Sequence, residues 1–129
     1  MQIFEKLITV VQDDLDELNH VNNVRYVKWV NDFAKEHWLQ NASEDICNDF
    51  FWVLLNHHIE YKNPAFLNDI VKLKTYVIKA EGVTSTRVVE MFNSKTNKLL
   101  IKSETNWCLI SSKTQRPTRI NSDIANLFN

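Results

Sequence analysis

The chain has 129 residues, a length that suits one domain with a single hydrophobic core. Hydrophobic residues make up 44% and charged residues 24%, as in an ordinary globular protein, and no apolar run approaches the roughly 20 residues of a membrane-spanning helix. A net charge of -1 and scattered lysines argue against a protein that binds duplex nucleic acid. The single glycine, Gly82, excludes glycine-rich phosphate-binding loops.

The N-terminal stretch and the two cysteines favour a cytoplasmic location. The opening stretch "MQIFEKLITVVQDD" alternates polar and apolar residues and lacks a basic region and a cleavage site, so we expect no signal peptide. Cys47 and Cys108 have no metal-binding spacing, and we expect both to be reduced thiols. We see no repeat or linker, so residues 1–129 are expected to form one domain.

Residues 2–11 are rich in β-branched and aromatic side chains and predict a first strand. From residue 24 to residue 38, apolar side chains recur at the helical period, which predicts one long amphipathic helix. Either Asn19 or Asn22 could cap this helix, because a short side-chain oxygen can accept from the unpaired amides of the first turn. A polar break, "QNASEDICND", follows the helix.

The second half of the chain is predicted to form strands joined by short turns. Four runs of β-type pattern lie at residues 51–62, 70–80, 83–93 and 98–110. The tail predicts a short helix with Ser122 as its N-cap. This order predicts an α+β fold, in which one helix packs on an antiparallel sheet. Because the first of these runs is strongly apolar, we expect a second subunit to cover part of the remaining surface.

The helix entrance carries the most specific signal. The run "DLDELNHVNNVRYVKW", followed later by "HHIEYKNPAF", resembles the hotdog-fold thioesterases of the 4-hydroxybenzoyl-CoA thioesterase type, and also the related acyl-carrier-protein thioesterases. The resemblance covers essentially the whole chain. It implies a hotdog fold, in which an antiparallel sheet wraps around one long helix, a homodimer or homotetramer, and an acyl-thioester substrate. We expect the reaction to need neither a metal nor an organic cofactor.

In that family the second acid of D-x-D is the catalytic carboxylate, a position that Asp16 occupies here. Such a carboxylate either attacks the thioester carbonyl or activates water, while donors stabilise the oxyanion. The free amides and positive dipole end of a helix N-terminus supply such donors, which places Asn22, Asn23 and Val24 near the reaction. We expect Asn23 to act through its backbone. His20 is open between a catalytic or orienting role and a hydrogen-bonded role at the helix start.

The remaining polar and aromatic residues have simpler interpretations as well. Acids before a helix stabilise its dipole, which is the interpretation we favour for the other three acids of the loop. Substrate contacts are expected from Asn19, Asn22, Val24 and Tyr26. The aromatic residues of the helix belong to the core or to an acyl pocket, and we favour the core. These aromatic residues are Tyr26, Trp29, Phe33 and Trp38.

The sequence departs from the family pattern in three places. Asn19 stands where the CoA enzymes often have glycine, and Leu18 replaces the asparagine of the D-x-N-x-H pattern of the carrier-protein enzymes. The stretch "KNPAF" lacks the downstream acid of those enzymes, and we interpret Glu60 as a solvated residue at the end of a strand.

The other histidines have structural interpretations. The adjacent residues His57 and His58 should face opposite sides of the sheet and cannot share a metal. His37, within the apolar helix arc, reads as a packed residue.

We therefore expect an acyl-CoA thioesterase that releases a free acid and CoA, led by Asp16. The alternatives are a thioesterase acting on acyl-carrier-protein, and a non-catalytic protein that binds acyl thioesters. A hotdog dehydratase is less favoured, because its acid lies within the long helix and this chain places its polar residues before the helix.

Overall fold

The computed structural model describes residues 1–129. Its strands and α-helices are, in chain order, β1 (Phe4–Thr9), α1 (Asn23–Asn41), α2 (Glu44–Asp49), β2 (Phe50–Tyr61), β3 (Ile70–Glu81), β4 (Thr84–Asn93), β5 (Leu99–Ser111) and α3 (Ser122–Ala125). Short 3-10 turns occupy residues 12–14 and 126–128. No helix of the chain is both long enough and apolar enough to cross a bilayer.

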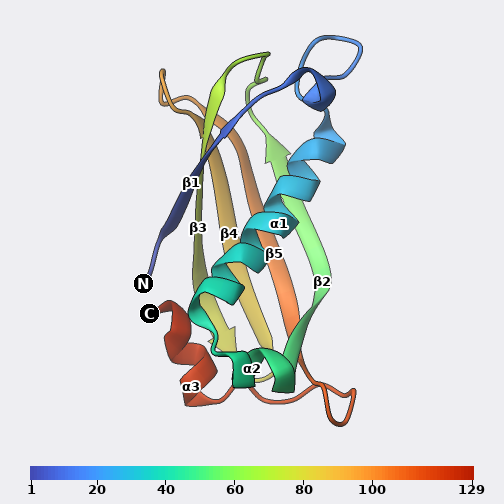
Figure 1. Cartoon of the computed structure of the whole chain (residues 1–129), viewed down its shortest axis with the longest axis vertical. Helices are drawn as coiled ribbons and strands as arrows, with labels where there is room; N and C mark the ends of the chain where they lie inside the picture. Colours follow the sequence, from blue (N-terminus) through green and yellow to red (C-terminus); the bar gives the residue numbers. More distant parts are fainter.

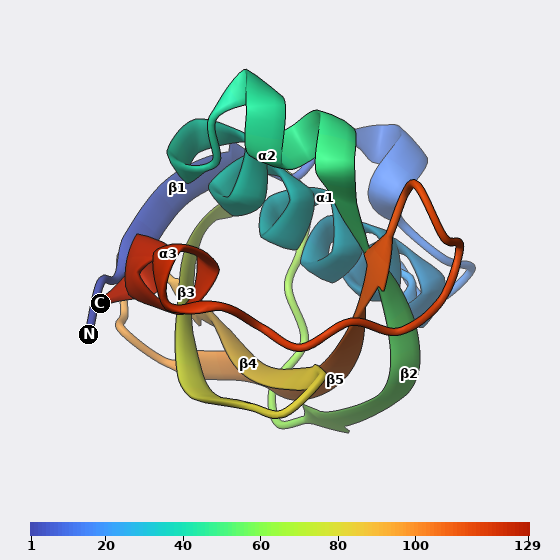
Figure 2. The same ribbon diagram turned by 90° about the horizontal axis from the view of Figure 1, so that it is seen from below.

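The five strands form one antiparallel sheet in the order β1-β3-β4-β5-β2. Figure 1 shows α1 running along one face of this sheet, and Figure 2, seen along the strands, shows the sheet curving around the helix. The predicted α+β hotdog fold is therefore confirmed. The two edges of the sheet are β1 and β2, and the second of these matters for the assembly described below.

The main core lies between α1 and the concave face of the sheet. Val30 and Phe33 of the helix are buried against Leu73 and Met91 of the central strands. Burying a side chain of this size contributes roughly 1.5–3 kcal/mol, so this interface fixes the helix on the sheet. The helical period and the alternation of the strands were therefore correct guides to the core.

Strand β2 contains a bulge at Leu55, where the pairing with β5 shifts by one residue. Before the bulge Trp52 and Leu54 are turned inward, and after it His57 and Ile59 are. The extra residue keeps the apolar side chains on one face although the sequence loses its strict alternation. His57 is half-buried and its Nε2 lies 2.7 Å from Ser103 Oγ, whereas His58 is exposed. The prediction that the two histidines face opposite sides is confirmed.

Two local predictions were wrong. The polar break after α1 contains the helix α2, and Ser43 caps it by accepting a hydrogen bond from the amide of Ile46 at 3.2 Å. A helix of six residues shows too little periodicity to stand out from a polar loop. In the tail, the N-cap is Asn121 and not Ser122, because Asn121 Oδ1 accepts from the amide of Ile124 at 2.9 Å.

A buried polar network ties α1 to the sheet. Arg87 of β4 donates through Nη1 to His37 Nδ1 at 2.8 Å and to Thr75 Oγ1 at 2.9 Å. Since a guanidinium only donates, Nδ1 of His37 is the acceptor and its Nε2 carries the proton, which it donates to Gln2 Oε1 at 2.6 Å. The predicted packing role of His37 is thus accompanied by two directed hydrogen bonds.

Acid should weaken this network. Burial, together with the Arg87 cation, lowers the pKa of His37 to about 4. The unfolded chain, with a histidine pKa near 6.5, then binds the proton first, so the free energy of unfolding should fall as pH drops from about 6.5 toward 4, by on the order of 3 kcal/mol. Urea unfolding across this range should give a flatter curve for His37→Gln. The exposed-site variant His58→Gln should keep the native slope, and parallel curves for all three proteins would contradict this assignment.

Candidate active site

The loop between β1 and α1 is closed on itself by backbone hydrogen bonds. Leu15 and Val21 form an antiparallel bridge, and within it the amide of Asp16 donates to the carbonyl of His20 at 2.8 Å. The amide of Asn19 donates to the carbonyl of Asp16 at 3.0 Å. The loop therefore holds its shape at one end of the helix, where Figure 1 shows it in blue.

Asn19 adopts a left-handed backbone with φ of 61°. Glycine reaches this conformation without strain, and asparagine is among the few other residues that visit it routinely. The replacement of glycine by asparagine at this position is thus compatible with the turn. A β-branched residue here would be strained.

The loop fixes the carboxylate of Asp16 through one of its two oxygens. Oδ1 accepts hydrogen bonds from the amides of Leu18 at 2.9 Å and His20 at 3.2 Å. Oδ2 makes no hydrogen bond within the chain, and the residue is partly exposed. The side chain is therefore oriented while one oxygen remains available.

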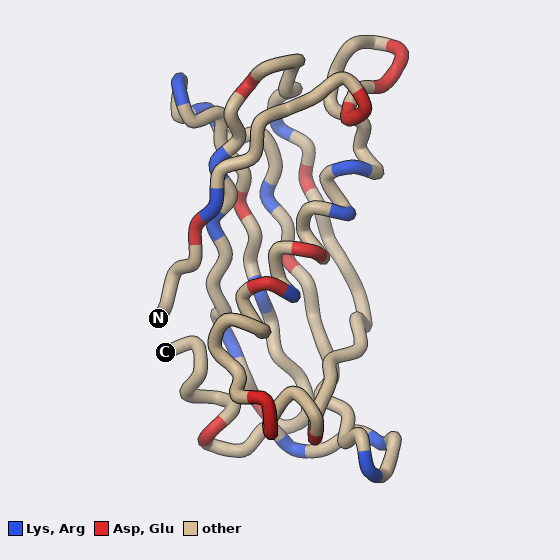
Figure 3. The backbone as a smooth tube through the Cα atoms, viewed as in Figure 1, with Lys and Arg blue, Asp and Glu red and all other residues tan.

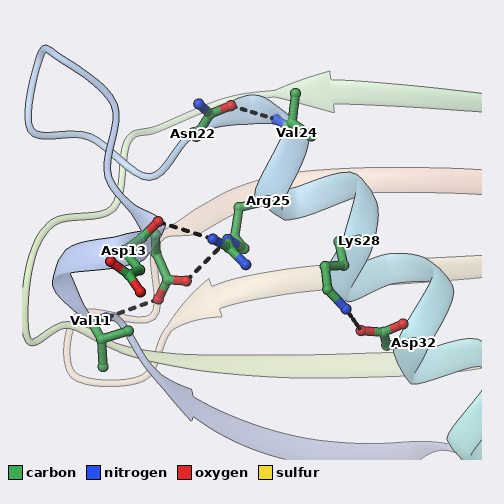
Figure 4. A network of polar contacts seen from close by, with 8 residues as sticks. Val11, Asp13, Asn22, Val24, Arg25, Lys28 and Asp32 are labelled. Atoms are coloured by element: carbon green, nitrogen blue, oxygen red, sulfur yellow. Dashed lines mark hydrogen bonds and ion pairs between the residues drawn. The ribbon is translucent and has the colours of Figure 1, made fainter.

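Helix α1 begins immediately after this loop. Asn22 is its N-cap, with Oδ1 accepting from the amide of Val24 at 2.9 Å, as Figure 4 shows. The amide of Asn22 donates to the carbonyl of Asp14 at 2.8 Å. The amide of Asn23 has no such partner in the loop. Of the three amides expected near the reaction, only that of Asn23 is free to donate to a bound oxyanion.

Asp14 is the buried acid of the loop. Its Oδ2 accepts from the amide of Val11 at 2.9 Å, and its Oδ1 lies 3.2 Å from Nε of Arg25 on α1. The same arginine donates through Nη2 to the carbonyl of Asp13 at 3.0 Å (Figure 4). Asp14 thus joins the segment that follows β1 to the first turn of α1, and its structural role is more specific than the dipole effect expected from the sequence.

Removing this carboxylate should loosen the entrance of the helix. In Asp14→Ala the Val11 amide and the Arg25 guanidinium both lose their partner, so we expect the free energy of unfolding to fall by about 2 kcal/mol. Asp13 has an exposed side chain with no hydrogen bond, and Asp13→Ala should change stability by less than about 0.5 kcal/mol. Equal stabilities of the two variants in urea unfolding would contradict the role of Asp14.

His20 and Tyr26 lie on either side of the helix start. The His20 ring makes an edge contact with Phe66, with ring centroids 5.1 Å apart, and remains partly exposed. Tyr26 is buried and packs against Trp29 and Tyr61, at centroid distances of 5.6 and 6.0 Å. Burial raises the pKa of Tyr26 to about 12, so its phenol stays protonated at neutral pH.

A pocket of about 510 Å³ opens between α1 and strands β2, β4 and β5. Ten of its 15 lining residues are hydrophobic, so it suits an apolar ligand. It begins around residue 31 of α1, and Ala34 lies ~16 Å along the helix axis from Asn23. Its apolar wall includes Ala34, Trp38, Phe50, Trp52, Leu54 and Trp107.

The four helix aromatics divide between core and pocket. Tyr26 and Phe33 are buried in the main core, and Trp29 packs against it. Trp38 belongs to a smaller core cluster with Leu109 and also lines the pocket. The pocket itself was missed, because it is assembled from strands far apart in the sequence.

Other candidate groups do not assemble into a site. Glu60 is exposed, at 3.0 Å from Lys62 Nζ and 3.5 Å from His58 Nε2. No three histidine, cysteine or acidic side chains lie close enough together to hold a metal ion. Figure 3 shows lysine and arginine positions spread over helix, strands and loops, and acidic positions in the loop before α1.

An antiparallel sheet curved around one long helix defines a protein of the hotdog fold, here with an oriented carboxylate near the helix N-terminus and an apolar pocket along the helix. The chain belongs to the thioesterase-like superfamily, whose family model matches residues 10–128. No curated protein matches the sequence significantly.

Solved structures share the fold at low sequence identity. The probable thioesterase YbaW of Escherichia coli is 21% identical, with a TM-score of 0.84 over 95% of this chain and 94% of that one. Slr0204 of Synechocystis, a 1,4-dihydroxy-2-naphthoyl-CoA thioesterase, is 16% identical, with a TM-score of 0.81 over 98% of both chains. SAV2348 of Staphylococcus aureus, solved in complex with CoA, is 17% identical, with a TM-score of 0.86 over 98% and 81%.

Proposed function

We propose that the protein hydrolyses acyl-CoA thioesters to a free acid and CoA. The observation that carries this proposal is the Asp16 carboxylate, oriented through Oδ1 with Oδ2 free, in the loop that ends at the unpaired amide of Asn23. Membership of the thioesterase-like superfamily supports it, as do the CoA complex and the CoA-thioester activity of two proteins of the same fold. Both cysteines are free, which supports a cytoplasmic location.

In the proposed reaction the thioester carbonyl oxygen points at the amide of Asn23. Oδ2 of Asp16 either takes a proton from the attacking water or attacks the carbonyl carbon itself. The carbon–sulfur bond then breaks, and the thiolate of CoA leaves and takes up a proton, which in the water route is the one that Asp16 removed. In the route by direct attack, a water then hydrolyses the mixed anhydride between the acyl group and Asp16, which releases the free acid and restores the carboxylate. The positive end of α1 stabilises the oxyanion that forms in between. His20 orients the thioester, and Asn19, Asn22, Val24 and Tyr26 shape the site around it.

We further propose that the working unit is a homodimer, or a tetramer built from such dimers, joined through β2. This strand pairs only with β5, so its other edge is bare over 12 residues. In the first half of the strand the outward side chains are apolar, with Val53 42% and Leu55 54% exposed. A long unpaired edge with such an apolar segment is normally covered, and a second copy is its self-complementary partner.

This assembly would bring the loop and the pocket together. Within one chain they are separated by a substantial length of α1. Two β2 strands paired antiparallel about a two-fold axis place the helices antiparallel as well, so the loop of one copy faces the pocket end of the other. Each site would then combine Asp16 of one subunit with the pocket of its partner.

Thiol release from a panel of short, medium, long and aromatic acyl-CoAs tests the proposed activity. We expect turnover that depends on Asp16 and peaks at acyl groups that fill the pocket. Turnover of acyl-carrier-protein alone would shift the assignment to that substrate. Ligand-induced stabilisation without turnover of either substrate would indicate a binding protein.

A further inference from the structure

The pocket contains a buried cation with no anionic partner. Arg87 is only 5% exposed, yet no acid lies within salt-bridge distance of its guanidinium. Its neighbours are neutral: His37 Nδ1, Thr75 Oγ1, and the Phe128 ring, whose centroid lies 5.1 Å from the guanidinium carbon. Buried charges in proteins are normally paired with an opposite charge, and Arg87 has no such partner within the chain.

Half of the guanidinium remains free. Both hydrogen bonds of Arg87 come from Nη1, whereas Nε and Nη2 make none within the chain. The only sealed and unpartnered side-chain polar atoms are Tyr26 Oη and Asn31 Oδ1, so Nε and Nη2 of Arg87 reach accessible space. Arg87 is one of the residues that line the pocket, and we assign the two donors to that space.

The other charged residues of the pocket do not neutralise Arg87. Asp32 lines the pocket but lies 2.6 Å from Lys28 Nζ, with which it forms an ion pair. Lys35 is exposed and carries the same sign as Arg87. The neutral network holds the guanidinium in place through Nη1, and its free side presents two donors in a largely apolar cavity. Two adjacent N–H groups of arginine match the two oxygens of a carboxylate.

We propose that Arg87 binds a carboxylate on the ligand, and that the preferred substrates carry one at the end of the acyl chain remote from the thioester. Assignment of that ligand as the acyl group of a CoA thioester rests on the proposed function. The apolar wall receives the methylene chain, and the distal carboxylate pairs with Nε and Nη2. The acyl class is therefore that of dicarboxylic acids bound to CoA through one end.

Matched substrates of equal chain length test this preference. For the native protein, kcat/KM should be about ten-fold or more higher for suberyl-CoA than for octanoyl-CoA, because only the former offers a charged partner to Arg87. The uncharged 8-hydroxyoctanoyl-CoA should behave like octanoyl-CoA. Adipoyl, sebacoyl and dodecanedioyl thioesters, beside their monocarboxylic counterparts, cover the case in which the pocket fits another length.

Substitution of Arg87 should remove the preference. In Arg87→Met the ratio of the two kcat/KM values should fall about ten-fold or more, while Arg87→Lys should keep part of it. Arg116 is exposed in the loop after β5, and Arg116→Met makes the same change of net charge away from the pocket. That control should leave the ratio unchanged.

A binding measurement separates this proposal from the enzymatic one. Three of the four tryptophans line the pocket, Trp38, Trp52 and Trp107, so ligand entry should alter the intrinsic fluorescence. Octanoate should bind Arg87→Met about ten-fold or more weakly than it binds the native protein, whereas 1-octanol should bind both equally.

The outcomes are distinct. Arg87-dependent octanoate binding without hydrolysis of any acyl-CoA would retain the anion site and reject the thioesterase function. Hydrolysis with equal rates for carboxylated and plain acyl groups at every length would reject the anion site and retain the function. If Arg87→Met does not fold, the native substrate ratio and the Arg87→Lys variant still decide between these results.

Discussion

Asp16→Asn should lower kcat for acyl-CoA hydrolysis by roughly 10²- to 10⁴-fold, the range expected when a positioned proton acceptor is removed. Asparagine keeps the shape of the side chain and one oxygen, so the hydrogen bonds from the amides of Leu18 and His20 can persist. The loop should therefore keep its structure while the free oxygen, Oδ2, is replaced by an amide nitrogen. The loss should appear in kcat more than in KM, because in the proposed site the acyl group is bound by the pocket and not by Asp16.

Asp13→Asn is the matched control for this result. Its side chain is exposed and makes no hydrogen bond, and the change removes the same charge from the same loop. We expect its kcat to stay within about two-fold of the native value. Similar losses in both variants would point to the overall charge of the loop, and native kcat in Asp16→Asn would remove Asp16 from the mechanism. Unfolding midpoints of all three proteins should agree closely.

A mixed dimer of two inactive subunits should regain activity. Asp16→Asn removes the carboxylate, and Ala34→Trp fills the pocket from α1, so each homodimer should be inactive. If each site combines the loop of one subunit with the pocket of the other, a mixed dimer has one intact site. Its activity should be about half that of the native dimer.

The mixed dimer can be isolated by co-expression with two different affinity tags and purification over both. A dimer that carries both substitutions in one subunit and none in the other has two damaged sites under the shared arrangement, and should stay inactive. The opposite pattern, with activity only in that second dimer, would show that each site lies within one chain. Val53→Lys should yield monomers by solution mass, and these monomers should be inactive because no site is complete without a partner subunit.

The elements of this fold were predictable because their patterns are local. The helix from Asn23 to Asn41 and the strands β2 to β5 are each at least ten residues long, so the pattern of each element can be recognised in the sequence. Helix α2 has six residues and no such period, so it was hidden in a polar stretch. The bulge at Leu55 interrupts the alternation of β2, yet the burial on both sides of it shows that one face is preserved.

The candidate site was predictable only in part. The acidic loop could be found because its residues are adjacent in the chain, but which acid is buried could not, since Asp14 owes its burial to Val11 and Arg25. Arg87 did carry a signal that went unused. In "TSTRVVEM" it shares the alternation of Ser85, Val89 and Met91, so it belongs to the inward face of β4. An arginine in such a position predicts a buried cation.

In the proposed enzyme, the self-contained loop at the start of α1 separates two tasks that many enzymes combine. The orientation of Asp16 comes from amides two and four residues further along the chain, and it owes nothing to the walls of the pocket. Changes in the pocket residues of α1 and β2 should therefore alter which ligand the pocket accepts without moving the Asp16 carboxylate. A fold arranged in this way can diversify its substrates by drift in the pocket, and the same independence makes it a favourable starting point for engineering new acyl selectivity.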